Sequence, residues 1–282
     1  MAARKVVVTG AAGVIASQVL PALRERYALT LLDIRANDRN GAPVAGICNA
    51  DLSNRDRDAY RQQFRGADAV LHLALVRSAS RQPDDRFQEE LGNLQMTYNV
   101  YQTALEEGVR RVVAASSNHA ADYYEPLLLD GTRAHVDADE RPLSEWYYGW
   151  AKAAQEHLGF VFAVGTQAGG KRLENVQLRI GGASETDVAR CPRGDMRCVR
   201  RALAVYVSAR DLQQLVVKSI ETADIRNERG VPFQIFYGIS NNDRAFWSIA
   251  NARRVIGYAP QDNSEARFAE LIAQHVAATR TA

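Results

Sequence analysis

The segment VVVTGAAGVIASQVL, residues 6–20, constrains the fold most, because a β-branched run leads into glycines and then into helical spacing of apolar residues. Gly10 permits a tight turn, Gly13 lets a pyrophosphate approach the backbone, and the small Ala16 allows a helix to pack closely on a strand. The start of such a helix offers free N–H groups and a favourable dipole to phosphates. The same glycine pattern also occurs in turns that bind nothing. The residues predicted to hold phosphates here are Gly10, Gly13, Val14 and Ile15.

Strand-like and helical patterns alternate through the first 117 residues. We expect strands at 5–10, 28–34, 46–52, 69–75 and 111–117, with helices at 14–26, 54–65 and 87–107 between them. Such alternation predicts a parallel sheet with helices on both faces.

The alternation of strand-like and helical patterns is less regular in the second half of the chain. We expect a polar loop at 118–143, a helix at 144–164, an irregular arginine-rich stretch at 184–201, strands at 176–182 and 231–237, and helices at 208–223 and 264–278. The prediction is one α/β domain over 1–282, a doubly wound parallel sheet of the Rossmann type. Residues 1–175 would mainly bind the dinucleotide, and 176–282 would mainly form a small substrate-binding lobe.

Composition argues against several classes of function. The chain carries 35 basic and 33 acidic residues, a net charge of +2, so its charge favours neither nucleic acid nor a membrane surface as a partner. No run approaches the roughly 18 apolar residues of a membrane helix, and the N-terminus lacks the apolar core of a signal peptide. We therefore expect a cytoplasmic protein.

The three cysteines, Cys48, Cys191 and Cys198, do not form the pattern of a disulfide framework. Cys191 and Cys198 can pair within one loop, or bind a metal with help from elsewhere, and both alternatives stay open. Without a CxxC motif or a nearby histidine, we expect no metal site.

Asp33 ends the second expected strand, where an acid can accept hydrogen bonds from the adenosine ribose and repel a 2′-phosphate. NAD is therefore favoured over NADP. Arg35 keeps NADP open, since an arginine there can pair with that phosphate, although a solvated surface residue is the simpler interpretation.

The stretch SEWYYGWAK, residues 144–152, places two tyrosines before a lysine. On a helix, residues four apart share a face, so Tyr148 rather than Tyr147 lies beside Lys152. An ammonium near a phenol favours the phenolate, which is a usable base. The spacing also fits an ordinary amphipathic helix with a buried tyrosine and a surface lysine.

Taken together, the TGxxGxxA turn, Asp33, the Ser116-Ser117 pair ending a strand and the downstream YxxxK resemble the short-chain dehydrogenase/reductase superfamily of the extended, NAD-dependent epimerase/dehydratase type. The resemblance implies that Ser117 orients a substrate hydroxyl, Tyr148 removes its proton, and Lys152 holds the nicotinamide ribose and tunes Tyr148. The further cofactor-binding residues that it implies are Asp51, Leu52, Leu73, Ala74 and Asn93.

Within that superfamily, SSNH followed by a Tyr-Tyr pair, YGWAK, LRIGG, ISNNDRAFW and VIGYAPQDNSEARF look like the uronate dehydrogenases. Those enzymes oxidise the C1 hydroxyl of a cyclic hexuronic acid to an aldarolactone with NAD and without a metal. The resemblance implies that Ser117, Asn118 and His119 hold sugar hydroxyls. It also implies that Arg201, one of five arginines between 190 and 201, grips the sugar carboxylate; a surface salt bridge is the alternative.

The chain departs from that pattern in three places. Arg77 and Gly182 stand where the family has serines, and the stretch between Arg179 and Arg201 is longer. The resemblance implies a small anionic sugar substrate, a uronate-like sugar acid. The added charge of Arg77 suggests a different or second anionic group, or a larger substrate, and a sugar phosphate, a sulfonated sugar or another sugar acid would fit. The full predicted substrate-binding set is Arg77, Ser117, Asn118, His119, Tyr148, Gly182 and Arg201.

Two other functions stay open. A nucleotide-sugar epimerase or dehydratase would accumulate no NADH, but such enzymes usually have a longer C-terminal lobe. A dinucleotide-sensing regulator would turn nothing over, but such proteins commonly lose the Tyr/Lys pair. The superfamily resemblance also implies a homo-oligomer, a dimer or larger, formed through the helices at 87–107 and 144–164.

Overall fold

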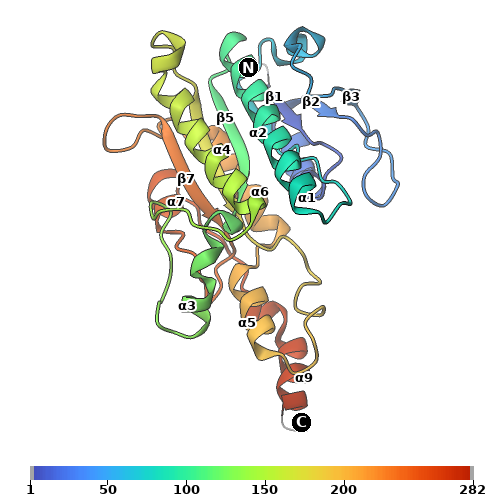
Figure 1. The fold of residues 1–282 in the computed structure, drawn as a ribbon, viewed down its shortest axis with the longest axis vertical. Coiled ribbons are helices and arrows are strands. Elements are labelled where there is room, and N and C mark those ends of the chain that lie inside the picture. The colour runs from blue at the N-terminus through green and yellow to red at the C-terminus, as the bar shows by residue number, and fades with distance from the viewer. Residues whose placement is uncertain (1–2, 280–282) are drawn as a thin grey trace.

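The computed structural model describes residues 3–279. Its centre is a seven-stranded, entirely parallel sheet in the order β3-β2-β1-β4-β5-β6-β7 (Figure 1). The strands are β1 (Lys5–Thr9), β2 (Ala28–Asp33), β3 (Ile47–Asn49), β4 (Ala69–His72), β5 (Arg111–Ser117), β6 (Glu174–Ile180) and β7 (Phe233–Gly238). The strand order reverses between β1 and β4, and a crevice for ligands opens at such a reversal, beyond the carboxyl ends of the strands. The predicted doubly wound sheet is confirmed.

Helices cover both faces of the sheet. The helices are α1 (Val14–Arg24), α2 (Pro83–Glu106), α3 (Glu125–Leu129), α4 (Tyr147–Val164), α5 (Met196–Val205), α6 (Ala209–Glu221), α7 (Ala250–Ile256), α8 (Ser264–Arg267) and α9 (Ala269–Thr279). Side chains alternate between the faces of a strand. Thus Val6 and Val8 of β1 join the core under α1, α6 and α7, whereas Val7 joins the core under α2 and α4.

A smaller layer lies beyond the carboxyl edge of the sheet, where Figure 1 shows α3, α5 and α9 below the strands. Its core includes Trp247, stacked on Tyr237 of β7 with ring centroids 5.0 Å apart. Trp247 is almost completely buried in this core. The layer is not wholly C-terminal, because α3 and the 3-10 helix η3 (Asn118–Tyr124) come from the stretch expected to be a polar loop.

Other departures from the expected elements are local. The helix expected at 54–65 is instead two short 3-10 helices, η1 (Arg57–Ala59) and η2 (Arg61–Phe64). The expected C-terminal helix is interrupted at Phe268, and α5 was expected to be irregular. A further 3-10 turn, η4 (Thr166–Ala168), follows α4.

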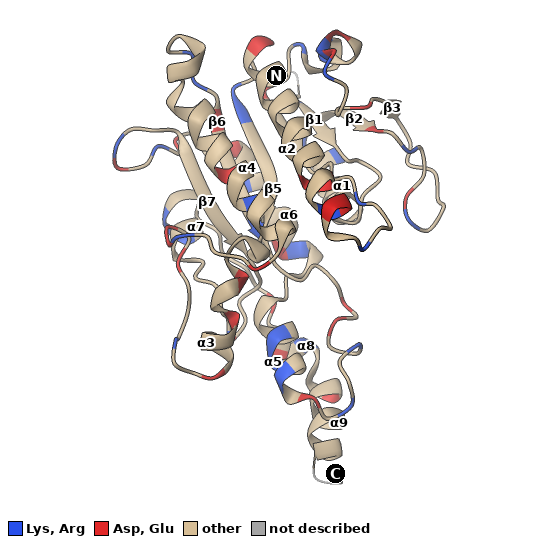
Figure 2. Cartoon of the chain, viewed as in Figure 1, with Lys and Arg blue, Asp and Glu red and all other residues tan. Residues whose placement is uncertain are grey.

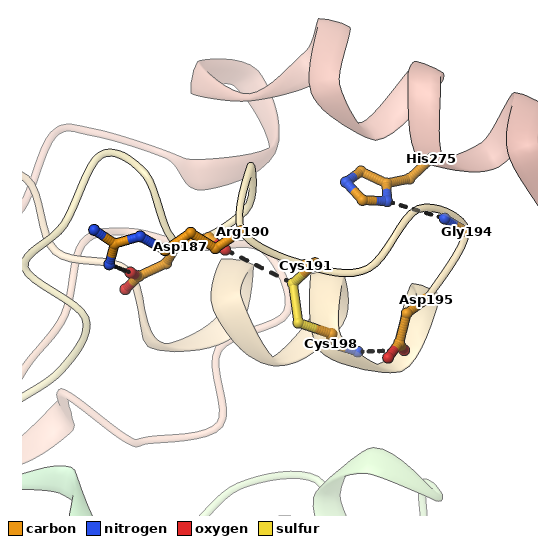
Figure 3. The surroundings of a disulfide bond; sticks show 7 residues. All are labelled: Asp187, Arg190, Cys191, Gly194, Asp195, Cys198 and His275. Carbon is orange, nitrogen blue, oxygen red and sulfur yellow. Dashed lines mark hydrogen bonds and ion pairs between the residues drawn. A yellow bond between two sulfur atoms is a disulfide. The ribbon is translucent and has the colours of Figure 1, made fainter.

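Cys191 and Cys198 form a disulfide, the first of the two alternatives considered for this pair (Figure 3). The bond ties the turn before α5 to the first turn of that helix, where Asp195 accepts a hydrogen bond from the Cys198 N–H at 2.9 Å. The core around it joins α5 to α8 and α9. Cys48 is a free, exposed thiol.

Over residues 3–279, no cluster of His, Cys, Asp or Glu side chains is arranged to hold a metal ion. In the same part of the chain, none of the helices combines the length and apolar character needed to cross a membrane.

Candidate active site

A cleft of about 710 Å³ opens at the carboxyl ends of β1, β2 and β4. It brings together nine of the predicted cofactor-binding residues with Arg77 and Tyr148. Those nine are Gly10, Gly13, Val14, Ile15, Asp33, Asp51, Leu52, Leu73 and Ala74. The crevice at the strand-order reversal therefore contains both the glycine turn and the candidate base.

The glycine turn has the shape of a phosphate cradle. Gly10 has a φ of +67°, and a Cβ on it would lie 2.6 Å from the backbone nitrogen of Ala74, so no side chain fits. Gly13 is the N-cap of α1 and provides no side-chain cap. The first-turn N–H groups of α1 therefore remain available to an anion, as a bound pyrophosphate requires.

Asp33 is buried at the other end of the cleft. Its carboxylate accepts hydrogen bonds from the N–H groups of Ala12 and Arg35, each at 2.9 Å. Each oxygen keeps a further lone pair for a ribose hydroxyl. Arg35, with its Nε 3.6 Å from Asp33, and Arg39 line the same end, which adds positive charge where a 2′-phosphate would lie.

Tyr148 is surrounded by charged and aromatic groups. The Arg77 guanidinium lies over its ring at 4.7 Å from the centroid, and the Lys152 Nζ lies 5.9 Å from the same point. The His119 ring meets it edge-on at 5.9 Å. Tyr147 instead is exposed and packs against Phe87 of α2, away from the Lys152 side of α4.

Lys152 is buried beneath Tyr148 and is held from the sheet side. Its Nζ donates to the Ala115 carbonyl at 2.7 Å and to the Gln155 side chain at 3.1 Å. Burial lowers the pKa of the Lys152 ammonium, and interaction with the Tyr148 phenolate works against that shift. A lysine so placed supports a negative charge on Tyr148 better than it would from open solvent.

The last residue of β5 and the segment after it contribute three polar side chains. Ser117 is buried, and its Oγ accepts the His119 N–H at 3.2 Å while lying 3.5 Å from Asn118 Oδ1. His119 Nδ1 is 2.8 Å from the Asp122 carboxylate. That contact places the ring proton on Nδ1 and leaves Nε2 as an acceptor in the neutral tautomer.

Asn93 has a different position from the one expected, because it does not line the cleft. Its side-chain amide accepts from the Val76 N–H at 2.9 Å and donates to the Val76 carbonyl at 3.1 Å. It also donates to Glu90, a buried acid whose carboxyl pKa is raised by burial. Asn93 thus fixes the loop that carries Arg77. The sequence contains no local signal that Asn93 would bind Val76 or Glu90.

Arg201 also differs from expectation. Its guanidinium is held bidentately by Glu125, with Nε–Oε2 at 2.6 Å and Nη2–Oε1 at 3.0 Å. The neighbouring Arg200 donates to the Leu128 and Leu129 carbonyls. Figure 2 shows basic residues gathered on α5. The fork predicted to grip a substrate carboxylate is filled by a carboxylate of this chain.

Gly182 lies just past β6 at the carboxyl edge. A Cβ on it would lie 3.1 Å from Asp187 Oδ2 and 3.2 Å from a Val205 methyl, so the inserted turn occupies the space of a side chain. Neither Gly182 nor Arg201 belongs to the cleft lining.

A buried ion pair beside the site was not anticipated. Glu156 binds Arg179 of β6 through two contacts of 2.8 Å and accepts from Ser116 at 2.6 Å. Burial of the Arg179 guanidinium acts to lower its pKa, but the hydrogen-bonded Glu156 carboxylate outweighs burial and raises that pKa. Glu156 follows Lys152 by four residues, so helical spacing places it on the same face of α4 as Tyr148 and Lys152. This spacing is the sequence signal that could have indicated a role for Glu156 beside the site.

Comparison with known proteins gives a consistent assignment. The model of the NAD dependent epimerase/dehydratase family matches residues 6–176. An L-arabinose 1-dehydrogenase (NAD(P)(+)) of Haloferax volcanii is 31% identical over 92% of this chain and 97% of its own length. An NAD-dependent glucose-6-phosphate dehydrogenase of the same organism is 32% identical over 92% and 94%.

Among solved structures, a mutated uronate dehydrogenase superposes with a TM-score of 0.74 at 28% identity, covering 96% of this chain and 86% of that one. The named substrates of these three relatives are a neutral sugar, a sugar phosphate and a sugar acid.

Proposed function

The chain belongs to the NAD dependent epimerase/dehydratase family, and from this membership we propose that it oxidises the C1 hydroxyl of an anionic sugar to a lactone. It is an NAD-dependent oxidoreductase acting on sugars, as its relatives are. The observation that carries the proposal is that Tyr148, with a buried lysine behind it, lines the same cleft as the phosphate cradle. The base and the dinucleotide site are therefore continuous.

In this mechanism the residues of the chain bind, orient and deprotonate. The first-turn N–H groups of α1 hold the pyrophosphate, and Asp33 holds the adenosine ribose. NAD held by these groups would supply the acceptor for the hydride of C1. Ser117 orients the C1 hydroxyl, and Tyr148 takes its proton, so the C1–H and O–H bonds break as the C1=O bond of the lactone forms. Lys152 keeps the base in its charged form.

Arg77 supports an anionic substrate. It lines the cleft beside Tyr148, and no Asp or Glu within residues 3–279 forms an ion pair with it. Arg201, in contrast, is already paired with Glu125. We therefore assign the substrate's phosphate, sulfonate or carboxylate to Arg77, whose fork suits such groups.

A screen for NADH formation tests the function directly. D-Glucuronate, D-galacturonate, D-glucose 6-phosphate, a sulfonated sugar and L-arabinose would each be offered with NAD and with NADP. We expect net NADH with an anionic sugar and a higher kcat/KM than with L-arabinose. Sugar interconversion without NADH would favour an epimerase. Coenzyme binding without turnover of any sugar would favour a regulator.

Arg77→Gln then tests the anion assignment. It should lower kcat/KM for the anionic substrate by about tenfold to a hundredfold relative to L-arabinose, the range expected for one lost charge-assisted contact. An equal loss for both sugars would contradict an anion-binding role.

We also propose a homodimer through α2 and α4. Exposed large apolar side chains gather on these adjacent helices and at the start of α4: Leu91, Tyr98, Trp146, Tyr147, Trp150 and Phe160. A second copy would bury them. Light scattering should give a dimer for the wild type and a monomer for Trp150→Glu; a monomeric wild type would contradict this.

We also propose a cytoplasmic location, where NAD would be available to the proposed reaction. The disulfide is the feature that argues against this location, because thiols there are usually kept reduced. Thiol trapping of Cys191 and Cys198 in intact cells would settle the location, because a largely reduced pair is expected and a fully oxidised pair would contradict it.

A further inference from the structure

Two cations approach the ring of Tyr148 from different elements. Arg77, from the loop between β4 and α2, lies 4.7 Å from the ring centroid, and Lys152, from α4, lies 5.9 Å from it. The assignment of Tyr148 as the base accounts for Lys152. The stacking of Arg77 on the ring has no role in that account.

The position of Arg77 is built into the fold. The residue before it, Val76, is held at both its N–H and its carbonyl by Asn93. The residue after it, Ser78, donates its N–H to the Glu89 carboxylate. Both anchors come from α2, so the backbone at Arg77 is fixed on either side and the side chain is directed over Tyr148.

A cation held within about 6 Å of a phenol stabilises the phenolate more than the neutral form. We propose that Arg77 is a second electrostatic activator of Tyr148, one that stabilises the phenolate before substrate binds. The proposal rests on the proposed function in taking Tyr148 as the base. Arg77 transfers no proton, because guanidinium stays charged throughout the working pH range; the proton of the C1 hydroxyl goes to the Tyr148 oxygen.

The remaining charges near Tyr148 explain why a second cation matters. Burial lowers the pKa of Lys152, so its positive charge is the easier of the two to lose. The nearby acids are already engaged, because Asp122 is bound by His119 and Glu90 accepts from Asn93. Burial also raises the pKa of the Glu90 carboxyl, which reduces its opposing negative charge. Arg77 thus supplies a permanent positive charge.

The first test is the pH dependence of kcat/KM with whichever sugar the wild type oxidises. In Arg77→Gln, the midpoint of the acidic limb should move upward by about one pH unit, as expected for a unit charge at this range in a partly solvated site. Arg77→Lys keeps the positive charge, so its midpoint should lie close to that of the wild type. Arg81→Gln removes a charge from the same loop without touching Tyr148 and should leave the midpoint unchanged. An unshifted midpoint in Arg77→Gln would overturn the proposal.

The second test needs no substrate. Ultraviolet difference titration of tyrosinate would be run on the wild type and on Arg77→Gln, each with its Tyr148→Phe counterpart subtracted. The transition that disappears with Tyr148 should lie at higher pH in Arg77→Gln, and equal midpoints would refute the proposal. If no sugar yielded NADH, the proposed function would fail while this titration still decided the role of Arg77.

Discussion

Glu125 holds Arg201 through both carboxylate oxygens, at 2.6 and 3.0 Å, across 76 residues of sequence. Glu125 begins α3 and Arg201 lies in α5, so the pair joins two helices of the layer below the sheet. The arginine expected to bind substrate is thereby engaged within the protein.

Glu125→Gln should release this fork. The partly buried pair stabilises the fold by about 1 kcal/mol, so we expect a small loss in the free energy of unfolding. Arg201 does not line the cleft, so kcat/KM for D-glucuronate relative to L-arabinose should stay unchanged. Steady-state kinetics with both sugars measures this ratio. A raised ratio would contradict this expectation by showing that the freed guanidinium reaches the substrate carboxylate.

Asp33 should set the choice of coenzyme. Asp33→Asn removes the charge that repels a 2′-phosphate and leaves Arg35 and Arg39 at the same end of the cleft. We expect the ratio of kcat/KM with NAD to that with NADP to fall by about tenfold or more. Arg35→Gln is the matched control and should change the ratio in the opposite direction. If Asp33→Asn left this ratio unchanged, the adenosine ribose would have to bind away from Asp33.

His72 should make stability depend on pH. It is fully buried between Thr9 and Thr97, and burial, aided by the Lys152 charge, lowers its pKa from 6.5 to about 3. The unfolded chain therefore binds one more proton between these values. Stability should be complete above about pH 6.5 and fall toward pH 3, with a slope of up to about 1.4 kcal/mol per pH unit from this group. Urea unfolding of wild type and His72→Gln across this range measures the difference, and parallel curves would contradict it.

The disulfide should stabilise the layer around α5. Cys191 and Cys198 are seven residues apart. Closing a loop of this length lowers the conformational entropy of the unfolded chain, which raises the free energy of unfolding by about 2–3 kcal/mol. Thermal unfolding of the double variant Cys191→Ser/Cys198→Ser should show a lower Tm, and the wild type in reductant should match it. Coenzyme affinity should not change, because neither cysteine lines the cleft. An unaltered Tm would show that the local core holds the turn without the bond.

The sheet and the cofactor cleft could be predicted because their determinants are local. Each strand is a short apolar run, and residues such as Gly10, Asp33 and Ala74 lie at or just past strand ends that the parallel topology gathers at one edge. Helical spacing predicts that Tyr148 rather than Tyr147 lies beside Lys152, and the superfamily resemblance implies their roles.

The layer below the sheet and the polar contacts could not be predicted, because they depend on partners distant in sequence. Glu125 and Arg201, and Asn93 and Val76, meet only after the chain has folded. The two short 3-10 helices at 57–64 replaced an expected helix, since packing of Tyr60 and Phe64 into the core overrode the apparent periodicity.

The central claim is that Tyr148 is the base of an NAD-dependent sugar oxidation. Tyr148→Phe keeps the ring under Arg77 and removes only the phenolic oxygen. We expect kcat for NADH formation to fall by roughly a thousandfold, while calorimetry shows NAD bound as tightly as by the wild type. Retention of more than a tenth of the wild-type kcat would contradict the account.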